Sequence, residues 1–461
     1  MNYSQAIDRL LSLVDHERAQ PVLPRQKRIY DLARIQTLLE RLGNPHLSVP
    51  TVHVAGTKGK GSVSALCDAA LHAAGYSTGF YSSPHLHSFC ERIRRDTLPI
   101  STTKFAALVE DLWPYQDWVK SNTALGPVSL FEYMTAMAFH CFAQDRVDFQ
   151  TVEVGLGGRL DATNVVTPSV CVITSISLDH TAILGDTLSQ IAAEKGGIIK
   201  PGTVAVVAPQ LPEAGETIIS ICRERKAQPV LVGKDVTWEK RASDLNGQSL
   251  LVRGRLGEYA VTIPLLGAYQ LENTATAVAA LEVLMEQGHS IPYEAILRGF
   301  GSTSWPCRME VLSRSPLVMV DGAHNAYSMA SLLGSLPKYL EYQRLVLIVG
   351  FSRDKSISDM VKLLSAGNPV VYATRSRHPR SVPPGDLVAQ FRDQGVKQVV
   401  ETPSAAEATE QALSLARPGD LVLATGSLFV AAEVREALLG IEPELYPDLL
   451  PPDLRPPRPA V

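Results

Sequence analysis

Several features that define common protein classes are missing from this sequence of 461 residues. None of its six cysteines is spaced C-x-x-C, which argues against a thiolate metal site or a disulfide framework. No run of about eighteen apolar residues occurs, so we expect no transmembrane helix. The first stretch, MNYSQAIDRLLSLVDHERAQ, is interrupted by charges and lacks the apolar core of a secretory signal. We therefore expect a reduced, cytoplasmic protein.

Strong charge of either sign is missing as well. The formal net charge is -4 at pH 7, which gives no electrostatic reason to expect binding to nucleic acid or to a membrane surface. The hydrophobic content of 45% and the charged content of 20% are ordinary for a globular protein. We therefore expect small-molecule partners. We also expect a monomeric chain.

Short apolar runs alternate with segments of helical periodicity along most of the chain. TVHVAG, FQTVEVG and SVCVITSI have the length of strands, and SVSALCDAALHAAG has the spacing of a helix. This alternation is typical of a mainly parallel sheet covered by helices. The rhythm restarts with PLVMVDGAHN, after the segment GSTSWP that begins at residue 301. We predict an α/β chain with domains over 1–300 and 301–440, and a proline-rich, disordered tail over 441–461.

The stretch HVAGTKGKGSVSAL, residues 53–66, has the character of a phosphate-binding loop but departs from the commonest formula. G-x-x-x-x-G-K-[ST] requires a glycine five residues before Gly59 and a hydroxyl directly after Lys60. Val54 and Gly61 stand at these two positions. A tight turn with flexible glycines is one explanation, but strand, glycine turn and helix also form the setting in which backbone N–H groups bind phosphate. The lysine between two glycines favours phosphate, and a metal bound with it would need ligands from elsewhere in the chain.

Oxygen and nitrogen ligands follow three other predicted strands. Ser82 and Ser83 follow one strand, Glu153 ends a second, and Asp179 and His180 follow a third. Each has an ordinary structural explanation: a turn serine, a carboxylate paired with a nearby arginine, or a helix-capping Asp-His pair. Open α/β sheets place their ligands at the carboxyl ends of strands. Three such candidates beside a phosphate loop therefore favour a nucleotide and metal site.

Longer motifs extend these signals in a fixed order along the chain. They are GTKGKGS, SSPHL…ERIR, VEVGLGGRLDATN, SLDHTAILGDTLSQIAAEKGGIIK, LENTATAVAAL, WPCRMEVL, VDGAHN and TGSLFVAAEVR. Together they resemble the folylpolyglutamate synthase/dihydrofolate synthase family of the Mur ligase superfamily, from about residue 30 to residue 436. The resemblance implies a P-loop-type first domain and a smaller, Rossmann-like second domain. It also implies ligation of L-glutamate to dihydropteroate or a folate through an acyl phosphate, with ATP as co-substrate and Mg²⁺ as cofactor.

The resemblance assigns roles to individual residues. The implied ATP contacts are Thr57, Lys58, Gly59, Lys60, Asn273, Arg308 and Asp321. The implied Mg²⁺ ligands are Ser83, Glu153 and His180. The implied contacts to the pterin substrate are Leu32, Ala33, Arg34, Ser129, Leu130, Phe131, Glu132, Leu160, Asp161 and Ala162. The implied contacts to the incoming glutamate are His324 and Ser427. The implied catalytic residues are Lys60, Lys195, Arg308 and His324.

Two of these residues also have structural alternatives. Lys195 matches a lysine that carries a carbamate in this family; an ammonium would repel Mg²⁺, whereas a carbamate could support a second metal ion. The alternative is a surface lysine near a helix end. His324 is a candidate to accept or orient the proton of the glutamate amine, and the alternative is a helix cap. Cys307 stands where the family usually has glycine and Phe429 where it often has tyrosine, so this chain differs at the hinge and at the last loop.

Two other functions stay open from the sequence. A cell-wall Mur ligase would share the fold and the acyl-phosphate chemistry, but the motifs SSPHL…ERIR and FEYMTAMAF resemble the folate branch. A nucleotide-gated binding protein would hydrolyse ATP without ligating anything, and the motifs DGAHN and TGS argue against it. The sequence does not decide whether the acceptor is dihydropteroate, a folate polyglutamate or both.

Overall fold

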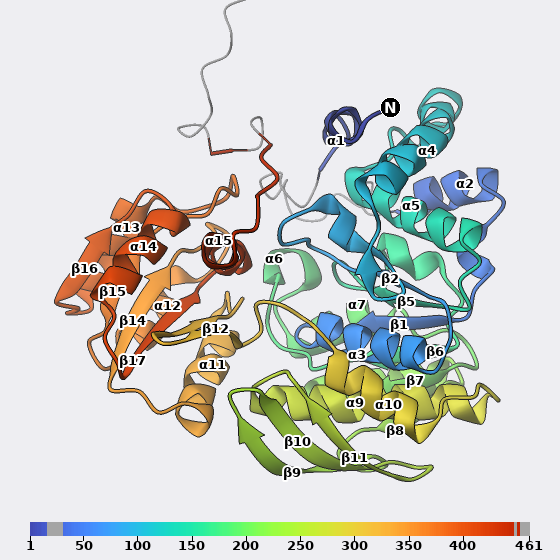
Figure 1. Cartoon of the computed structure of the whole chain (residues 1–461). Coiled ribbons are helices and arrows are strands. Elements are labelled where there is room, and N and C mark those ends of the chain that lie inside the picture. Colours follow the sequence, from blue (N-terminus) through green and yellow to red (C-terminus); the bar gives the residue numbers. More distant parts are fainter. Residues whose placement is uncertain (16–30, 447–449, 452–461) are drawn as a thin grey trace, which may run out of the picture.

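A computed structural model describes residues 1–15, 31–446 and 450–451 of the chain. Within this part the chain forms two units, each built on a sheet with helices packed against it (Figure 1). We call the described part of residues 1–302 the first unit and residues 310–439 the second unit. Helix α10 (Tyr293–Ser302) ends the first unit, and strand β12 (Glu310–Arg314) begins the second. No helix of the described part is both long and apolar enough to cross a membrane.

The first unit contains an eight-stranded sheet in the order β4-β3-β2-β5-β1-β6-β7-β8. The strands are β1 Thr51–Ala55, β2 Thr78–Tyr81, β3 Ile93–Arg95, β4 Leu98–Pro99, β5 Phe149–Glu153, β6 Val170–Ile173, β7 Val204–Val207 and β8 Gln228–Leu231. From β2 to β8 every neighbouring pair is parallel, and only the edge strands β3 and β4 pair antiparallel. The predicted mainly parallel sheet is confirmed.

Alternate residues of the central strands face opposite helical layers. Val172 and Val206 belong to the same core cluster as residues of α3, α9 and α10, whereas Ile173 and Val207 cluster with α7 and α8. Both faces are covered, so these strands read as continuous apolar runs. The helices of this unit are α1 Tyr3–Leu11, α2 Ala33–Arg41, α3 Lys60–Ala73, α4 Thr102–Asn122, α5 Leu130–Gln144, α6 Thr181–Leu184, α7 Leu188–Gly196, α8 Pro212–Glu224, α9 Ala268–Glu286 and α10.

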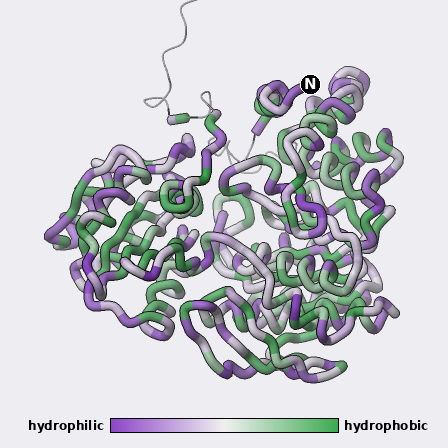
Figure 2. The backbone as a smooth tube through the Cα atoms, viewed as in Figure 1, coloured by the Kyte–Doolittle hydropathy of each residue, from purple (hydrophilic) through white to green (hydrophobic). Residues whose placement is uncertain are grey.

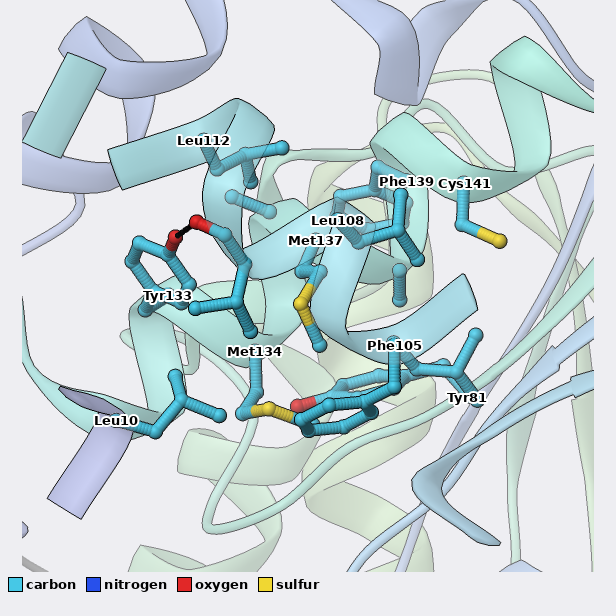
Figure 3. Packing of buried hydrophobic residues seen from close by; sticks show 14 of the residues in the cluster. Leu10, Tyr81, Phe105, Leu108, Leu112, Tyr133, Met134, Met137, Phe139 and Cys141 are labelled. Atoms are coloured by element: carbon cyan, nitrogen blue, oxygen red, sulfur yellow. Dashed lines mark hydrogen bonds between the residues drawn. The ribbon is translucent and has the colours of Figure 1, made fainter. Parts of the chain in front are cut away.

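Helices α4 and α5 enclose a further apolar core beside the sheet. Figure 3 shows Phe105 and Leu108 of α4 close to Met134 and Met137 of α5. The hydroxyl of Tyr133 in this cluster donates to the carbonyl oxygen of Val109 at 2.8 Å, so its polar atom is satisfied within the core. This packing fixes the start of α5, which forms one wall of the site.

Three antiparallel strands of the first unit were not predicted. They are β9 Thr237–Asp244, β10 Gly247–Arg253 and β11 Glu258–Ile263, and they form a separate sheet below α9 and α10 in Figure 1. On β11 the side chains of Tyr259, Val261 and Ile263 are buried and the residues between them are exposed. That alternation is the signal of a half-buried strand, and it was available in the sequence.

The second unit contains a six-stranded sheet in the order β12-β13-β17-β14-β15-β16. The strands are β12, β13 Leu317–Val320, β14 Arg344–Val349, β15 Val370–Ala373, β16 Gln398–Glu401 and β17 Asp420–Thr425. The helices are α11 Ala326–Tyr339, α12 Ile357–Leu364, α13 Pro384–Asp393, α14 Ala405–Leu415 and α15 Leu428–Leu439. Only β12 pairs antiparallel, and hydrophobic residues gather along the inner strands (Figure 2). The predicted second α/β unit is confirmed.

The start of the predicted tail returns to the first unit. Glu444 accepts a hydrogen bond from the Tyr3 hydroxyl at 2.8 Å, and the Tyr446 ring lies 5.5 Å from the ring of Phe89. Residues 447–449 and 452–461 of the tail lie outside the described part, and so does the disorder predicted for them. The domain boundary near residue 301 stays a prediction.

Candidate active site

The carboxyl ends of the two parallel sheets border one shared cavity of about 630 Å³. Its walls follow β1, β2, β5 and β6 in the first unit and β13, β14, β15 and β17 in the second. Open α/β sheets bind ligands at this edge. The predicted site residues that line the cavity are Thr57, Lys58, Gly59, Lys60, Ser83, Ser129, Phe131, Glu132, Glu153, Leu160, Asp161, Ala162, His180, Lys195, Asn273, Arg308, Asp321, His324 and Ser427.

The turn between β1 and α3 has the geometry of a phosphate loop. The backbone N–H groups of Thr57 and Lys58 donate to the carbonyl oxygen of Ser175 at 2.9 and 3.1 Å, which ties the loop to the segment after β6. Gly59 caps α3 with a φ of 90°, and a Cβ added there would lie 2.3 Å from Asn273 Oδ1. Only glycine suits that position. The N-terminus of α3, beginning at Lys60, therefore borders the cavity, as phosphate binding requires.

Gly61 explains why the loop departs from the commonest formula. A Cβ at this position would lie 2.4 Å from Cζ2 of Trp305, in the connection between the two units. The Trp305 ring is itself held, because the Arg94 guanidinium carbon lies 5.1 Å from its centroid. A serine or threonine would therefore collide with the indole ring. The hydroxyl that binds Mg²⁺ in the common loop has no room here, so a metal needs ligands from other strand ends.

Ser83 and Glu153 come from the ends of the neighbouring strands β2 and β5. The Ser83 backbone hydrogen-bonds the Glu153 carboxylate, but Glu153 is 6% exposed and its Oε2 has no hydrogen-bond partner among the described residues. Burial raises the pKa of this carboxyl, against the opposing charge of Lys60. An unpaired buried oxygen is costly, and a cation would satisfy it. Glu153 therefore fits the role of a metal ligand.

His180 borders the cavity from the loop after β6. The His180 side chain is 41% exposed; desolvation by its neighbours and the charge of Lys355 lower its pKa to about 3, so its ring is neutral and able to coordinate a metal. The described residues contain no group of three or more His, Cys, Asp or Glu placed to hold a metal ion. A Mg²⁺ ion held by Ser83, Glu153 and His180 would therefore complete its shell with phosphate and water oxygens, as Mg²⁺ usually does.

Lys195 lies near the end of α7 and is 5% exposed, so the alternative of a surface lysine is wrong. Its Nζ donates to the carbonyl oxygen of Gly56 in the phosphate loop at 2.9 Å. Burial, followed by the positive charge of Lys60, lowers the pKa of Lys195 to about 7. A large fraction of this amine is therefore neutral near pH 7 and available as a nucleophile.

Arg308 lies in a connection with unusual backbone geometry. Cys307 and Met309 on either side of it have φ values of 59° and 45°. The Asp321 carboxylate fixes this connection by accepting the backbone N–H groups of Met309 at 2.9 Å and Ala323 at 2.8 Å. The left-handed φ at Cys307 explains the family's usual glycine, and a side chain there costs roughly 1–2 kcal/mol of backbone strain. Here the cysteine side chain is buried in the core of the second unit.

His324 lies two residues before α11. The residue that caps this helix is its neighbour Asn325, so the alternative that His324 is a helix cap is wrong. Its Nδ1 lies 2.8 Å from the carbonyl oxygen of Gly322 and must donate, because a carbonyl only accepts. The Nε2 acceptor then lies 3.3 Å from Lys58 Nζ. The charge of Lys58, followed by burial, lowers the pKa of His324 to about 4. The ring is neutral at physiological pH.

Ser427 and Phe429 form the last loop of the site. The Ser427 Oγ accepts the backbone N–H of Phe429 at 3.2 Å and caps α15. The Phe429 ring stacks on the His378 ring with centroids 4.5 Å apart. Phe429, which stands where the family often has tyrosine, thus still places an aromatic ring in the cavity wall.

Known proteins resemble the chain over nearly its whole length. The family model of the Mur ligase middle domain matches residues 54–281, and the model of the Mur ligase, glutamate ligase domain matches residues 307–428. The Bacillus subtilis protein named dihydrofolate synthase/folylpolyglutamate synthase is 34% identical over 411 residues, which cover 88% of this chain and 94% of that protein. The chain belongs to the folylpolyglutamate synthase/dihydrofolate synthase family of the Mur ligases.

Solved structures of this family agree with the fold. Mycobacterium tuberculosis folylpolyglutamate synthase, complexed with ADP and AMPPCP, has a TM-score of 0.87 and 31% identity, and the match covers 96% of this chain and all of the other. Escherichia coli FolC, in complex with DHPP and ADP, has a TM-score of 0.82 and 29% identity, with 95% and 98% covered. The predicted family, α/β fold and ligase class are therefore confirmed.

The acceptor segments predicted from the folylpolyglutamate synthase family fall into two groups. The residues that line the cavity are Ser129, Phe131, Glu132, Leu160, Asp161 and Ala162. Those that do not line it are Leu32, Ala33, Arg34 and Leu130. Arg34 Nε instead pairs with Glu132 at 3.1 Å, both side chains being buried, and Leu130 belongs to the apolar core. Arg34 and Leu130 therefore lie in buried packing contacts and do not form the cavity wall.

Several charged residues that line the cavity were absent from the predicted site, and Asp179 and Lys355 are two of them. Asp179 was recognised at a strand end but given no role, and Lys355 follows β14 in the stretch FSRDKS. Although burial alone would raise it, the positive charges of Lys58 and Lys355 hold the pKa of Asp179 well below its usual range. The strand-end rule, applied to the second sheet as it was to the first, would have found Lys355.

Proposed function

We propose that this chain ligates L-glutamate to dihydropteroate, to a folate, or to both, at the expense of ATP. The observation that carries the proposal is the single cavity, lined by a phosphate loop from the first unit and by residues of the glutamate ligase domain from the second. The family members solved with ADP, AMPPCP and DHPP support small-molecule substrates of this class. A monomeric state and a cytoplasmic location stay predictions.

The chemistry requires a cavity with two walls. A carboxylate is a poor acylating agent, so the acceptor carboxylate first attacks the γ-phosphorus of ATP and releases ADP. The amine of glutamate then attacks the acyl carbon of the resulting acyl phosphate. The bond to the phosphate oxygen breaks, and the products are an amide, inorganic phosphate and the proton lost by the amine. The intermediate must be kept from water between the two steps.

Named residues suit each of these steps. Carboxylate and triphosphate are both anionic. Lys60 of the first unit and Arg308 of the connection between the units border the cavity and can neutralise and align them. The N-terminus of α3 adds its partial positive charge. His324 orients the amine through Nε2, because a ring whose pKa is about 4 holds a proton only briefly near neutral pH.

Mg²⁺ would be held by Ser83, Glu153 and His180. When bound, it would neutralise the triphosphate during phosphoryl transfer. The chain prepares this site with an unpaired carboxylate oxygen on Glu153 and a neutral ring on His180. The blocked hydroxyl position at Gly61 is consistent with a site built from other loops.

Lys195 is proposed to carry a carbamate, and its formation should depend on pH. The neutral amine attacks CO₂ and loses a proton, which yields an anion. Since the pKa of Lys195 is lowered to about 7, the amine is protonated below that pH and reactive above it. We expect a carbamate signal in ¹³C NMR with ¹³C-bicarbonate that grows as the pH rises through about 7.

Two variants decide the assignment of that signal. Lys195→Ala should lack it, ligate poorly and be partly rescued by small carboxylates. Lys200→Ala should keep it, because Lys200 donates to the carbonyl oxygen of Asn164 at 2.8 Å and does not line the cavity. A free ammonium on Lys195 in the active, ATP-bound protein would remove the carbamate from the account.

Two alternatives make different demands on the same cavity. A cell-wall ligase would take a nucleotide-sugar peptide as acceptor, and a nucleotide-gated binding protein would turn over ATP without glutamate. The direct test is whether the purified chain forms a glutamyl amide from ATP, L-glutamate and either dihydropteroate or tetrahydrofolate.

A further inference from the structure

One carboxylate joins the two units at the cavity. Asp179 lies in the loop between β6 and α6, and its side chain is 8% exposed. Its Oδ2 accepts hydrogen bonds from Lys58 Nζ at 3.0 Å and Asn325 Nδ2 at 2.9 Å. Its Oδ1 accepts from Lys355 Nζ at 3.0 Å and from the backbone N–H of His180 at 3.0 Å. Each oxygen therefore has one partner from the first unit and one from the second.

The partners of Asp179 have different tasks in the proposed reaction. Lys58 belongs to the phosphate loop, and His180 is a candidate metal ligand. Asn325 follows His324, whose Nε2 lies 3.7 Å from Asp179 Oδ2. A carboxylate has about four lone-pair sites, and these four donors fill them. Separation of the units would remove one donor from each oxygen and leave a buried charge incompletely paired, which is costly.

A second contact between the units lies away from the cavity. Glu436 of α15 is 2.9 Å from Nδ1 of His87, which belongs to the first unit, and it also pairs with Arg377. Neither Glu436 nor His87 lines the cavity. This contact can hold the units together without touching the phosphate loop. Asp179 differs, because it binds the phosphate loop and the second unit at once.

We propose that Asp179 is a positioning residue that locks the second unit, and with it His324, onto the phosphate loop when the enzyme closes. The kinetic consequence rests on the proposed ligase function. Closure brings the residues of the second unit against the acyl phosphate and excludes water from it. Removal of the carboxylate charge should therefore uncouple nucleotide binding from ligation.

The kinetic test compares Asp179→Asn, Lys355→Met and the double variant in the full chain. Each single variant should lower kcat for ligation at least about thirtyfold, because a displacement of about 1 Å can cost roughly a hundredfold. The Kd of ADP with Mg²⁺, measured by calorimetry, should change less than about threefold, since every residue of the phosphate loop is retained. The double variant should lose no more than about twofold beyond the slower single variant, because the two residues act as one unit.

Closure is measured separately by energy transfer between two dyes. Glu224→Cys near the end of α8 and Asp393→Cys at the end of α13 place the dyes on exposed positions of the two units. The six native cysteines are all buried and do not compete for label. With AMPPCP and Mg²⁺, the otherwise unchanged protein should show one short-distance population. Asp179→Asn should show a broader and longer distribution.

Glu436→Gln is the matched control, because it alters an interunit contact that does not reach the cavity. It should lower kcat less than about threefold and keep the short distance. The proposal is overturned if this control loses as much activity as Asp179→Asn. It is also overturned if ADP affinity falls as far as kcat, or if Asp179→Asn keeps the short distance. Failure of the ligase function would appear instead as glutamate-independent ADP release by the unsubstituted protein, and the distance measurement would still decide closure.

Discussion

Residues 1–300 expressed alone are expected to bind ADP and to form no measurable amide product. Arg308, Asp321, His324 and Ser427 line the cavity from beyond this fragment. We expect ligation to fall at least about a thousandfold, because closure both assembles the site and keeps water from the acyl phosphate. Amide formation is measured by mass spectrometry of the products, and nucleotide binding by calorimetry.

A full-length variant makes the result independent of how well the fragment folds. Arg308→Ala keeps both units and should lower ligation at least about a hundredfold, as expected for a lost electrostatic contact to the transition state. Arg308 is itself an implied ATP contact, so the affinity for ADP can fall, but ADP binding through the phosphate loop that is still measurable shows that the variant is folded. Substantial ligation by the fragment, or near-normal ligation by Arg308→Ala, would show that the residues beyond position 300 do not complete the site.

Removal of a candidate metal ligand is expected to have the second-largest effect. Glu153→Gln and His180→Ala should each lower ligation at least about a hundredfold at limiting Mg²⁺, the scale typical of lost electrostatic stabilisation. Raised Mg²⁺ should restore part of the activity, because the remaining ligands and the phosphate oxygens still bind the ion weakly. The apparent Mg²⁺ requirement is read from ligation rates over a series of Mg²⁺ concentrations.

The control for the metal variants is Glu216→Gln on α8, an exposed carboxylate that does not line the cavity. Its Mg²⁺ requirement should equal that of the unsubstituted chain. If Glu153→Gln and His180→Ala ligate at near-normal rates at limiting Mg²⁺, neither residue is a ligand. Rates that are low but indifferent to added Mg²⁺ would also contradict the assignment.

Local sequence patterns were sufficient to predict the elements whose structure depends on neighbouring residues alone. The apolar runs that became β1, β5 and β6 are buried on both faces, so their period and length identified parallel strands directly. The turn at Gly59 was also predicted from neighbouring residues, because a φ of 90° requires glycine and the glycine is visible in the sequence. The strands β9 to β11 interrupt the alternation of strand and helix that predicted the other strands, and they were not predicted although β11 alternates clearly between buried and exposed residues.

Contacts between distant segments were much harder to foresee. Arg34 pairs with Glu132, 98 positions away, and this pairing takes Arg34 out of the cavity wall. Asp179 and Lys355 are 176 positions apart, and no periodicity links them. The steric conflict between a side chain at position 61 and the distant Trp305 ring likewise arises only in the folded chain. Residue roles that depend on such contacts came from the family resemblance or were missed.

The most direct measurement of the central claim is the release of ADP together with the formation of amide product, with one substrate omitted at a time. The account predicts that sustained ADP release requires Mg²⁺, L-glutamate and an acceptor, either dihydropteroate or tetrahydrofolate, and that each ADP is matched by one amide. The rate with each acceptor also identifies the natural substrate class. ADP release that is unchanged when glutamate is omitted, with no amide formed from either acceptor, would contradict the account.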